Sequence, residues 1–206
     1  MTVEVLLFDL GGVLIEIDFD RVARSWASMA GVDESRVLND FALDRHYDDY
    51  EAGRLSAAEY FAHLRGHLRL DLSDDQFAHG WNQVLVGEQP GMRELLQQLA
   101  QRYPIDLFSN NNPVHEPTWN RDYADLLRPI RKQYLSHLLG ARKPEPESFT
   151  RVLAGIGVEP GKVLFFDDTL PNVIAARNAG LQATHIDLSK PASVAEQVTQ
   201  AVAHCS

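Results

Sequence analysis

Cysteine is almost absent from this chain, which has one among 206 residues, and that one, Cys205, is the last but one. A single cysteine cannot form an internal disulfide, which argues against a disulfide-stabilised secreted domain. The chain also lacks any apolar run of the roughly 20 residues that span a bilayer. Its amino terminus starts with strand-like sequence instead of a basic segment and a cleavage site, which argues against a signal peptide. We therefore expect a cytoplasmic protein with no membrane partner.

Basic residues are also scarce, because 19 Lys and Arg stand against 29 Asp and Glu and give a formal net charge of −10. Nucleic-acid phosphates need a basic surface, so this balance argues against a nucleic-acid partner. A small anionic substrate stays compatible with it, because a pocket can oppose the charge of the whole chain, above all when it holds a divalent cation. At 206 residues, the chain is long enough for one domain or one domain with an insertion.

Short apolar runs that alternate with amphipathic segments indicate the fold class. The predicted strands cover 3–8, 105–108, 163–166 and 183–186, and the predicted helices cover 91–101, 146–154 and 171–179. Strands that alternate with helices are typical of an α/β fold. We expect a Rossmann-like parallel sheet with helices on both faces.

The alternation stops between about residues 18 and 86, where helix starts replace strands. Ser56 with Glu59, and Ser73 with Gln76, have the spacing of the capping box that begins a helix. This block could form a second layer of the domain, but a small helical cap inserted after the first strand fits better. We expect a cap of residues 16–86 over the carboxyl ends of the strands, where such sheets bind ligands, on a core of residues 1–15 and 87–206.

Polar side chains directly follow three of the predicted strands. Each has an ordinary explanation by itself, since Ser and Asn suit turns, Asp suits helix starts and Lys is usually solvated. Together they place carboxylates, a hydroxyl and an ammonium group at one edge of one sheet, which is difficult to explain by local structure. The group consists of Asp9, Ser109, Asn110, Asp167 and Asp168, together with Lys143 before the helix at 146.

The chemistry of this group suits a phosphate ester. Three neighbouring carboxylates repel one another unless a cation neutralises them, and oxygen ligands are those that Mg²⁺ prefers. A metal ion, the ammonium of Lys143 and the hydroxyl of Ser109 would all face anionic oxygens. A carboxylate that the metal does not neutralise completely could attack phosphorus.

Four segments in this order resemble the four motifs of the haloacid dehalogenase superfamily. They are "FDLGGVL", "LFSNNN", "GARKPEPESF" and "FFDDTLPN", and the resemblance runs from Asp9 to about Asn172. The inserted helical block is similar to the small cap of that superfamily. Within it, the segments "HGW", "SNNNPVHEPTW" and "RKPEP" look most like the α-D-glucose-1-phosphatase group.

The resemblance implies a role for each matching residue. It implies a two-step reaction in which Asp9 takes the phosphoryl group and water then releases inorganic phosphate. It also implies that the Gly11 carbonyl, Asp9 and Asp168 bind Mg²⁺, with Asp167 as a ligand directly or through water. Ser109 and Asn110 match residues that bind the phosphoryl oxygens, and Lys143 matches the lysine beside the nucleophile.

The chain departs from the family pattern at Gly11, where phosphatases of the superfamily usually carry an Asp that protonates the leaving oxygen. Without a general acid the reaction slows by about 10²–10⁴-fold. Either the leaving group is good, as an anomeric hydroxyl is, or the chain binds phosphate without turnover. By residue type, His46, Glu51 and His115 are candidates for a replacement acid. Arg45 and His46 could reach the substrate from the cap.

We therefore predict a Mg²⁺-dependent phosphomonoesterase that acts on a small phosphorylated metabolite, such as an aldose 1-phosphate. Two alternatives remain open, which are a dehalogenase that uses the same Asp on carbon and a catalytically vestigial phosphate-binding protein. The sequence does not choose between a monomer and a small homo-oligomer.

Overall fold

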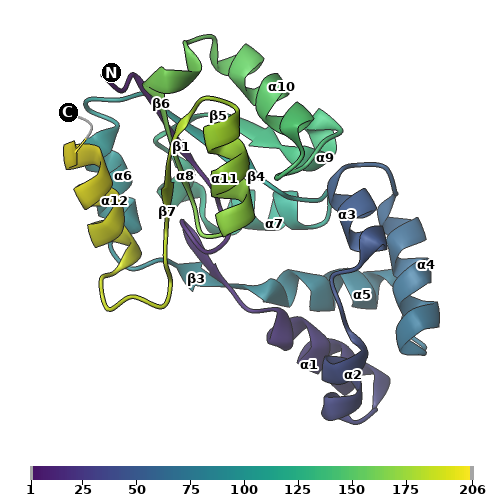
Figure 1. Cartoon of the computed structure of the whole chain (residues 1–206). Coiled ribbons are helices and arrows are strands. Elements are labelled where there is room, and N and C mark those ends of the chain that lie inside the picture. The colour runs from purple at the N-terminus through teal and green to yellow at the C-terminus, as the bar shows by residue number, and fades with distance from the viewer. Residues whose placement is uncertain (1, 205–206) are drawn as a thin grey trace.

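A five-stranded parallel sheet in the strand order β5-β4-β1-β6-β7 forms the centre of the computed structural model (Figure 1). The structure describes residues 2–204, so Cys205 lies outside the described residues. The strands are β1 (Val5–Phe8), β4 (Ile105–Ser109), β5 (Ile130–Leu135), β6 (Val163–Asp167) and β7 (Gln182–His185). All four predicted strands belong to this sheet, and β5 is an edge strand that the sequence analysis missed.

The central strand β1 sets the register of the sheet. Phe8 is level with Leu107 of β4 on one side and with Phe166 of β6 on the other. The rings of Phe8 and Phe166 stack with their centroids 4.6 Å apart. Because the three strands run parallel and end at one level, the residues that follow them meet at one edge of the sheet.

Helices cover both faces of the sheet, as predicted. Side chains alternate along β1, so that Leu6 and Phe8 pack on one face and Val5 and Leu7 on the other. The first face is covered by α6 (Met92–Leu99), α7 (His115–Asp122), α8 (Ala124–Leu127) and α12 (Val194–His204), and the second by α10 (Pro146–Ile156) and α11 (Leu170–Asn178). The short α9 (Ser136–Leu139) follows β5, and the 3₁₀ turn η2 (Pro160–Lys162) precedes β6.

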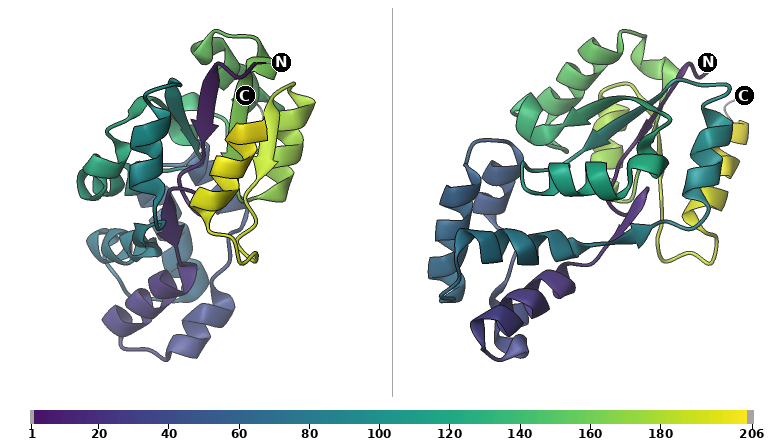
Figure 2. Two further views of the ribbon diagram at one scale, coloured as in Figure 1. Left: turned by 90° about the vertical axis from the view of Figure 1, so that its left-hand side faces the viewer. Right: turned by 180° about the vertical axis from the view of Figure 1, so that it is seen from behind.

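A two-stranded antiparallel hairpin leads from the sheet to a separate group of helices (Figure 2). The strands of the hairpin, β2 (Ile15–Ile17) and β3 (Leu85–Glu88), were not predicted. Between them lie α1 (Phe19–Ala30), α2 (Glu34–Asp40), α3 (Arg45–Glu51), α4 (Ala57–Leu68), α5 (Asp74–Trp81) and the 3₁₀ turn η1 (Asn82–Val84). A helical cap inserted after the first strand is therefore confirmed, while its predicted limits at 16 and 86 stay a prediction.

The cap has an aromatic core of its own. The rings of Trp26 and Trp81 stack with centroids 5.6 Å apart, and the Trp26 Nε1–H donates to the Phe77 carbonyl over 3.0 Å. Both predicted capping boxes are present, at the starts of α4 and α5. Within residues 2–204, no helix has the length and apolar character needed to cross a membrane.

The substitution Gly80→Ala should destabilise the cap, because the new Cβ would lie 2.3 Å from Cδ1 of Trp26. Overpacking of this kind costs about 1–3 kcal/mol. The matched control is Gly66→Ala on α4, where a Cβ meets nothing within 4 Å. That change should instead stabilise the helix by about 0.5–1 kcal/mol. Urea unfolding of the two variants measures the difference, and equal effects would contradict the packing described here.

Candidate active site

Asp9 stands directly after β1, at the edge where the parallel strands end. Its backbone N–H donates to the Phe166 carbonyl over 2.9 Å, which extends the pairing with β6 by one residue. Its Oδ1 accepts the Leu10 N–H over 2.7 Å and lies 2.9 Å from Nζ of Lys143. The carboxylate is buried. Its contacts with the Leu10 N–H and the Lys143 ammonium fix its orientation.

Lys143 is the only lysine among the described buried residues, with 1% of its side chain exposed. Its Nζ lies 2.9 Å from Oδ1 of Asp9 and 2.7 Å from Oδ2 of Asp167, and it donates to the Phe108 carbonyl over 2.9 Å. Burial by itself lowers the pKa of Lys143, but attraction to Asp167 and Asp9 outweighs burial and raises this pKa above its usual value. The site thus contains a permanent buried cation.

A reciprocal pair of hydrogen bonds fixes the backbone of Lys143 to the loop after β4. The Asn110 Nδ2 donates to the Lys143 carbonyl over 2.9 Å, and the Lys143 N–H donates to Oδ1 of Asn110 over 2.8 Å. Since both groups of the Asn110 amide are used in this way, its side chain positions the lysine. The neighbouring Ser109 hydroxyl donates to the Asn110 carbonyl over 3.1 Å.

Asp167 is the last residue of β6 and Asp168 follows it, and the two have different surroundings. Both oxygens of the fully buried Asp167 are occupied: Oδ2 by Lys143, Oδ1 by the Thr169 N–H, and both by Nδ2 of Asn172 at 3.1 Å. Asp168 is only partly buried. Burial and then the charge of Asp167 raise the pKa of Asp168. This arrangement suits Asp167 to orienting Lys143 and leaves Asp168 available to a metal ion.

The donor set at this edge fits Mg²⁺. Asp9, Asp167 and Asp168 each offer a carboxylate oxygen, and these oxygens lie within 4.8 Å of one another. Burial, and then the neighbouring carboxylates against the pull of Lys143, raise the pKa of Asp9 well above its usual range. Ionising all three groups therefore requires more positive charge than Lys143 provides, and a hard divalent cation with oxygen ligands would supply it.

The two glycines after Asp9 have different structural reasons. Gly12 has φ +76°, and a Cβ there would lie 2.4 Å from Oδ2 of Asp168, so a side chain at this position would collide with the carboxylate. A Cβ on Gly11 would lie 3.1 Å from Cδ1 of Ile17. The space beside position 11 is thus bounded by an aliphatic side chain of β2.

A cavity lies between the cap and this edge of the sheet. Gly11, Ser109, Asn110, Asn111, His115 and Trp119 line its core side, and Ile17, Phe19, Tyr47, Glu51, Val84 and Leu85 are among the residues that line the other. Tyr47 and Glu51 come from α3. Of the described residues around this cavity, Glu51 alone carries a carboxyl group.

Glu51 is buried and connects the cap to the core. Its Oε1 accepts the Tyr47 hydroxyl over 2.6 Å, and its Oε2 lies 2.9 Å from Nη2 of Arg142, the residue before Lys143. Burial raises the pKa of Glu51, although the charge of Arg142 opposes that effect. The sequence analysis named Glu51 as a candidate acid by type, and the structure places it on the cavity wall.

His115 also lines the cavity but cannot act as an acid near neutral pH. Its ring stacks on Trp81 with centroids 5.2 Å apart, and its Nδ1 lies 2.9 Å from Oδ1 of Asn82. Burial lowers the pKa of His115 to about 3. The imidazole is therefore uncharged near pH 7 and has no imidazolium proton to donate.

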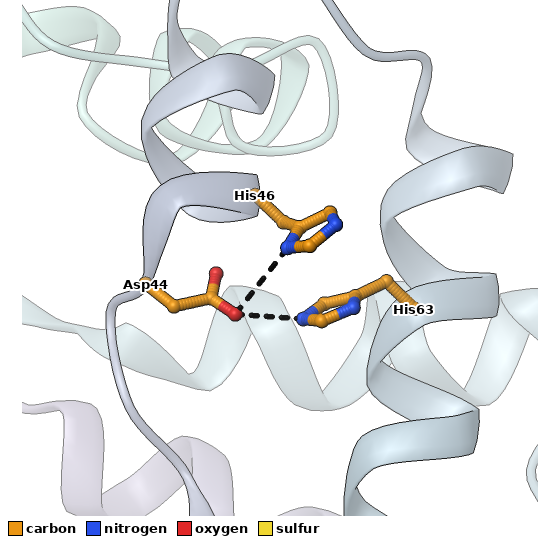
Figure 3. Close-up of side chains that lie close together, drawn as sticks. All are labelled: Asp44, His46 and His63. Carbon is orange, nitrogen blue, oxygen red and sulfur yellow. Dashed lines mark hydrogen bonds and ion pairs between the residues drawn. The ribbon is translucent and has the colours of Figure 1, made fainter.

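The structure places Arg45 and His46 on α3 but not among the residues of the cavity wall. The Arg45 side chain is 91% exposed and its Nε lies 3.7 Å from Oδ2 of Asp49. His46 lies beside Asp44 and His63 instead (Figure 3). Their predicted contact with the substrate stays a prediction. Tyr47 and Glu51, on the same helix, line the cavity.

Comparison with known proteins relates this chain to a family of hydrolases. The model of the haloacid dehalogenase-like hydrolases matches residues 3–180. D-ribitol-5-phosphate phosphatase of Bacteroides thetaiotaomicron is 26% identical over 86% of this chain and 88% of its own length. N-acetylmuramic acid 6-phosphate phosphatase of Pseudomonas aeruginosa is 28% identical over 87% of this chain and 80% of its own.

The crystal structure of a HAD family enzyme from B. thetaiotaomicron, in complex with magnesium and inorganic phosphate, superposes on this chain with a TM-score of 0.78. The two chains are 28% identical, and the match covers 91% of this chain and 96% of the other. The observed fold is thus the one that the resemblance of the motifs implied. A similar chain has been crystallised with magnesium, the metal that the carboxylate cluster fits.

The buried neutral state of His115 predicts a pH dependence of stability. In the unfolded chain a histidine takes up its proton near pH 6.5, whereas in the folded chain His115 does so only near pH 3. The contribution of His115 to the free energy of unfolding is therefore fully present above pH 6.5 and falls as the pH drops below it, by up to about 1.4 kcal/mol per pH unit. We expect His115→Gln to lose about 1–2 kcal/mol less than the wild type between pH 7 and pH 5.

Urea unfolding at both pH values measures this difference. The matched control is His79→Gln, which changes an exposed histidine and should follow the wild type. Equal losses in all three proteins would show that His115 is not held in its neutral form.

Proposed function

We propose that this chain, which belongs to the haloacid dehalogenase-like hydrolases and is a phosphatase of their type, hydrolyses a small sugar or sugar-alcohol phosphate with Mg²⁺ as cofactor. The observation that carries the proposal is the buried Lys143 ammonium, 2.9 Å from Asp9, beside two further carboxylates at one strand edge. The names of the relatives support the substrate class, because they include the phosphates of a sugar alcohol and of an amino sugar.

Asp9 is the proposed nucleophile. One of its carboxylate oxygens forms a bond to phosphorus as the bond to the alcohol oxygen breaks, and the alcohol oxygen leaves as the alkoxide and takes its proton from water. Water then attacks phosphorus, the aspartyl oxygen leaves, and inorganic phosphate is released. Lys143 stabilises the ionised form of Asp9. Ser109 and the backbone N–H of Asn110 are the proposed donors to the phosphoryl oxygens.

The proposed metal ligands are Asp9, Asp168 and the backbone carbonyl of Gly11, with Asp167 nearby. When bound, Mg²⁺ supplies positive charge against the phosphoryl oxygens. Since both oxygens of Asp167 already accept hydrogen bonds, its proposed role is to hold Lys143, with at most a water-mediated contact to the metal. Asn172 supports Asp167 in this role through its Nδ2.

The cap, which we take to comprise residues 16–86, closes the site and selects the substrate. Gly11 offers no acid, and Ile17 occupies the space beside it. A leaving group that needs little protonation suits such a site, and the anomeric hydroxyl of a sugar is one. We therefore propose an aldose 1-phosphate as substrate, in line with the resemblance to the α-D-glucose-1-phosphatase group.

Phosphate release from a panel of sugar phosphates tests this proposal. The panel pairs an aldose 1-phosphate with the same sugar phosphorylated at its primary hydroxyl, each with Mg²⁺ and with a chelator. We expect Mg²⁺-dependent release that is faster from the 1-phosphate by about 10²-fold or more, because the primary alkoxide needs an acid. Asp9→Asn, prepared in the same way, should release nothing and controls for contaminating phosphatases.

Other outcomes would revise the proposal in defined ways. Release that survives the chelator would contradict the role of Mg²⁺. Fast release from primary phosphates would contradict the leaving-group argument and require an acid. Glu51 is then the residue to replace by Gln. Release from no compound by a folded protein that binds Mg²⁺ would favour a vestigial phosphate-binding site.

A further inference from the structure

The cap contains a second cluster of metal-ligating groups, on helices α3 and α4. Asp44 precedes the first residue of α3, His46 lies in its first turn, and His63 projects from the middle of α4 (Figure 3). None of the three is among the residues that line the cavity beside Asp9. The activity proposed above does not use them.

Three potential ligand atoms of this cluster point toward one another. Oδ2 of Asp44 lies 2.7 Å from Nε2 of His63 and 3.5 Å from Nδ1 of His46. The ligand atoms of all three residues lie within 4.8 Å of one another. In a tetrahedral site with bonds of about 2.0–2.1 Å, neighbouring ligands are about 3.3 Å apart. The Asp44–His46 separation is close to this spacing, while Asp44 and His63 are at hydrogen-bond distance and would move apart when an ion binds.

Hydrogen bonding alone satisfies these groups poorly. Both ring nitrogens face the same oxygen of Asp44, because its Oδ1 accepts the Tyr47 N–H over 3.1 Å. The two rings also stack, with centroids 3.6 Å apart and planes 14° apart. Two N–H groups would compete for one carboxylate oxygen. A cation would instead bind one ligand atom of each residue, once the two rings turn so that their in-plane lone pairs converge on it.

The two helices that carry this cluster pack against each other, and the cluster is open to solvent on one side. The rings of Tyr50 and Tyr60 stack with centroids 4.6 Å apart and pack α3 against α4. The side chain of His46 is 52% exposed and that of His63 is 23% exposed. An ion can therefore enter from solvent, and water can complete its coordination.

We propose that Oδ2 of Asp44, Nδ1 of His46 and Nε2 of His63 bind a divalent transition-metal ion such as Zn²⁺, with water as a further ligand. Two imidazole nitrogens and one carboxylate are a donor set for Zn²⁺ and similar ions, whereas Mg²⁺ prefers oxygen ligands throughout. The site is distinct from the carboxylates at the strand edge. A bound ion would link α3 to α4, and α3 carries Tyr47 and Glu51 to the cavity wall.

Calorimetric titration of the metal-stripped full chain with Zn²⁺ tests the proposal. An excess of Mg²⁺ in the buffer occupies the oxygen ligands at the strand edge. We expect one equivalent of Zn²⁺ to bind. The variants His46→Gln and His63→Gln should bind it at least about tenfold more weakly, since a lost ligand costs no less than a lost supporting contact. Asp44→Asn should also weaken binding, while its amide oxygen can still cap α3.

Two controls test whether Zn²⁺ binds at this cluster and not at another histidine. The exposed His79→Gln should bind as the wild type does, and Zn²⁺ should raise the thermal midpoint of the wild type but not that of a His46→Gln/His63→Gln double variant. Far-UV circular dichroism confirms that each variant is folded. Unchanged Zn²⁺ affinity in the folded His63→Gln variant, or affinity that is lost only in Asp168→Asn, would overturn the proposal.

Discussion

The contact on which the rest of the site depends is that of the buried Lys143 ammonium with Asp9 and Asp167. A buried cation is tolerated only when it is paired, and removing one partner of such a pair typically costs about 3–5 kcal/mol. This pairing explains why a carboxylate as inaccessible as Asp167 follows a central strand. It also allows three carboxylates to share one strand edge, since Lys143 neutralises part of their charge and leaves the remainder for a divalent cation.

The loop between α9 and α10, which carries Arg142 and Lys143, also connects the active-site residues to the cap. Lys143 contacts the nucleophile, and the preceding Arg142 contacts Glu51 and Asp48 of α3. The Ser136 hydroxyl adds a hydrogen bond of 2.6 Å to the Glu51 carbonyl. Two neighbouring residues therefore position the strand edge and the wall of the cavity relative to each other. A cap movement that admits substrate has to break contacts within one residue of the buried cation.

The pattern of apolar residues along the chain explains which parts of this arrangement could be predicted. Buried parallel strands are continuous apolar runs, and their ends share one edge, so Asp9, Ser109 and Asp168 could be grouped without a structure. The edge strand β5 was missed because three of its six residues are exposed, two of them charged. The cap contacts depend on helix phase and docking, which one sequence does not fix. Of the two α3 side chains that line the cavity, Glu51 could be named by residue type, whereas Tyr47 could not be singled out.

The most direct test of the account is to look for the phosphoryl group on Asp9 itself. Enzyme mixed with ³²P-labelled substrate and Mg²⁺ is quenched in acid within a single turnover and mapped by peptide. The account predicts label on the amino-terminal peptide that contains Asp9, and none after a chase with unlabelled substrate. Label on another residue, or full turnover with no labelled enzyme at any time, would contradict the assignment of Asp9 as nucleophile.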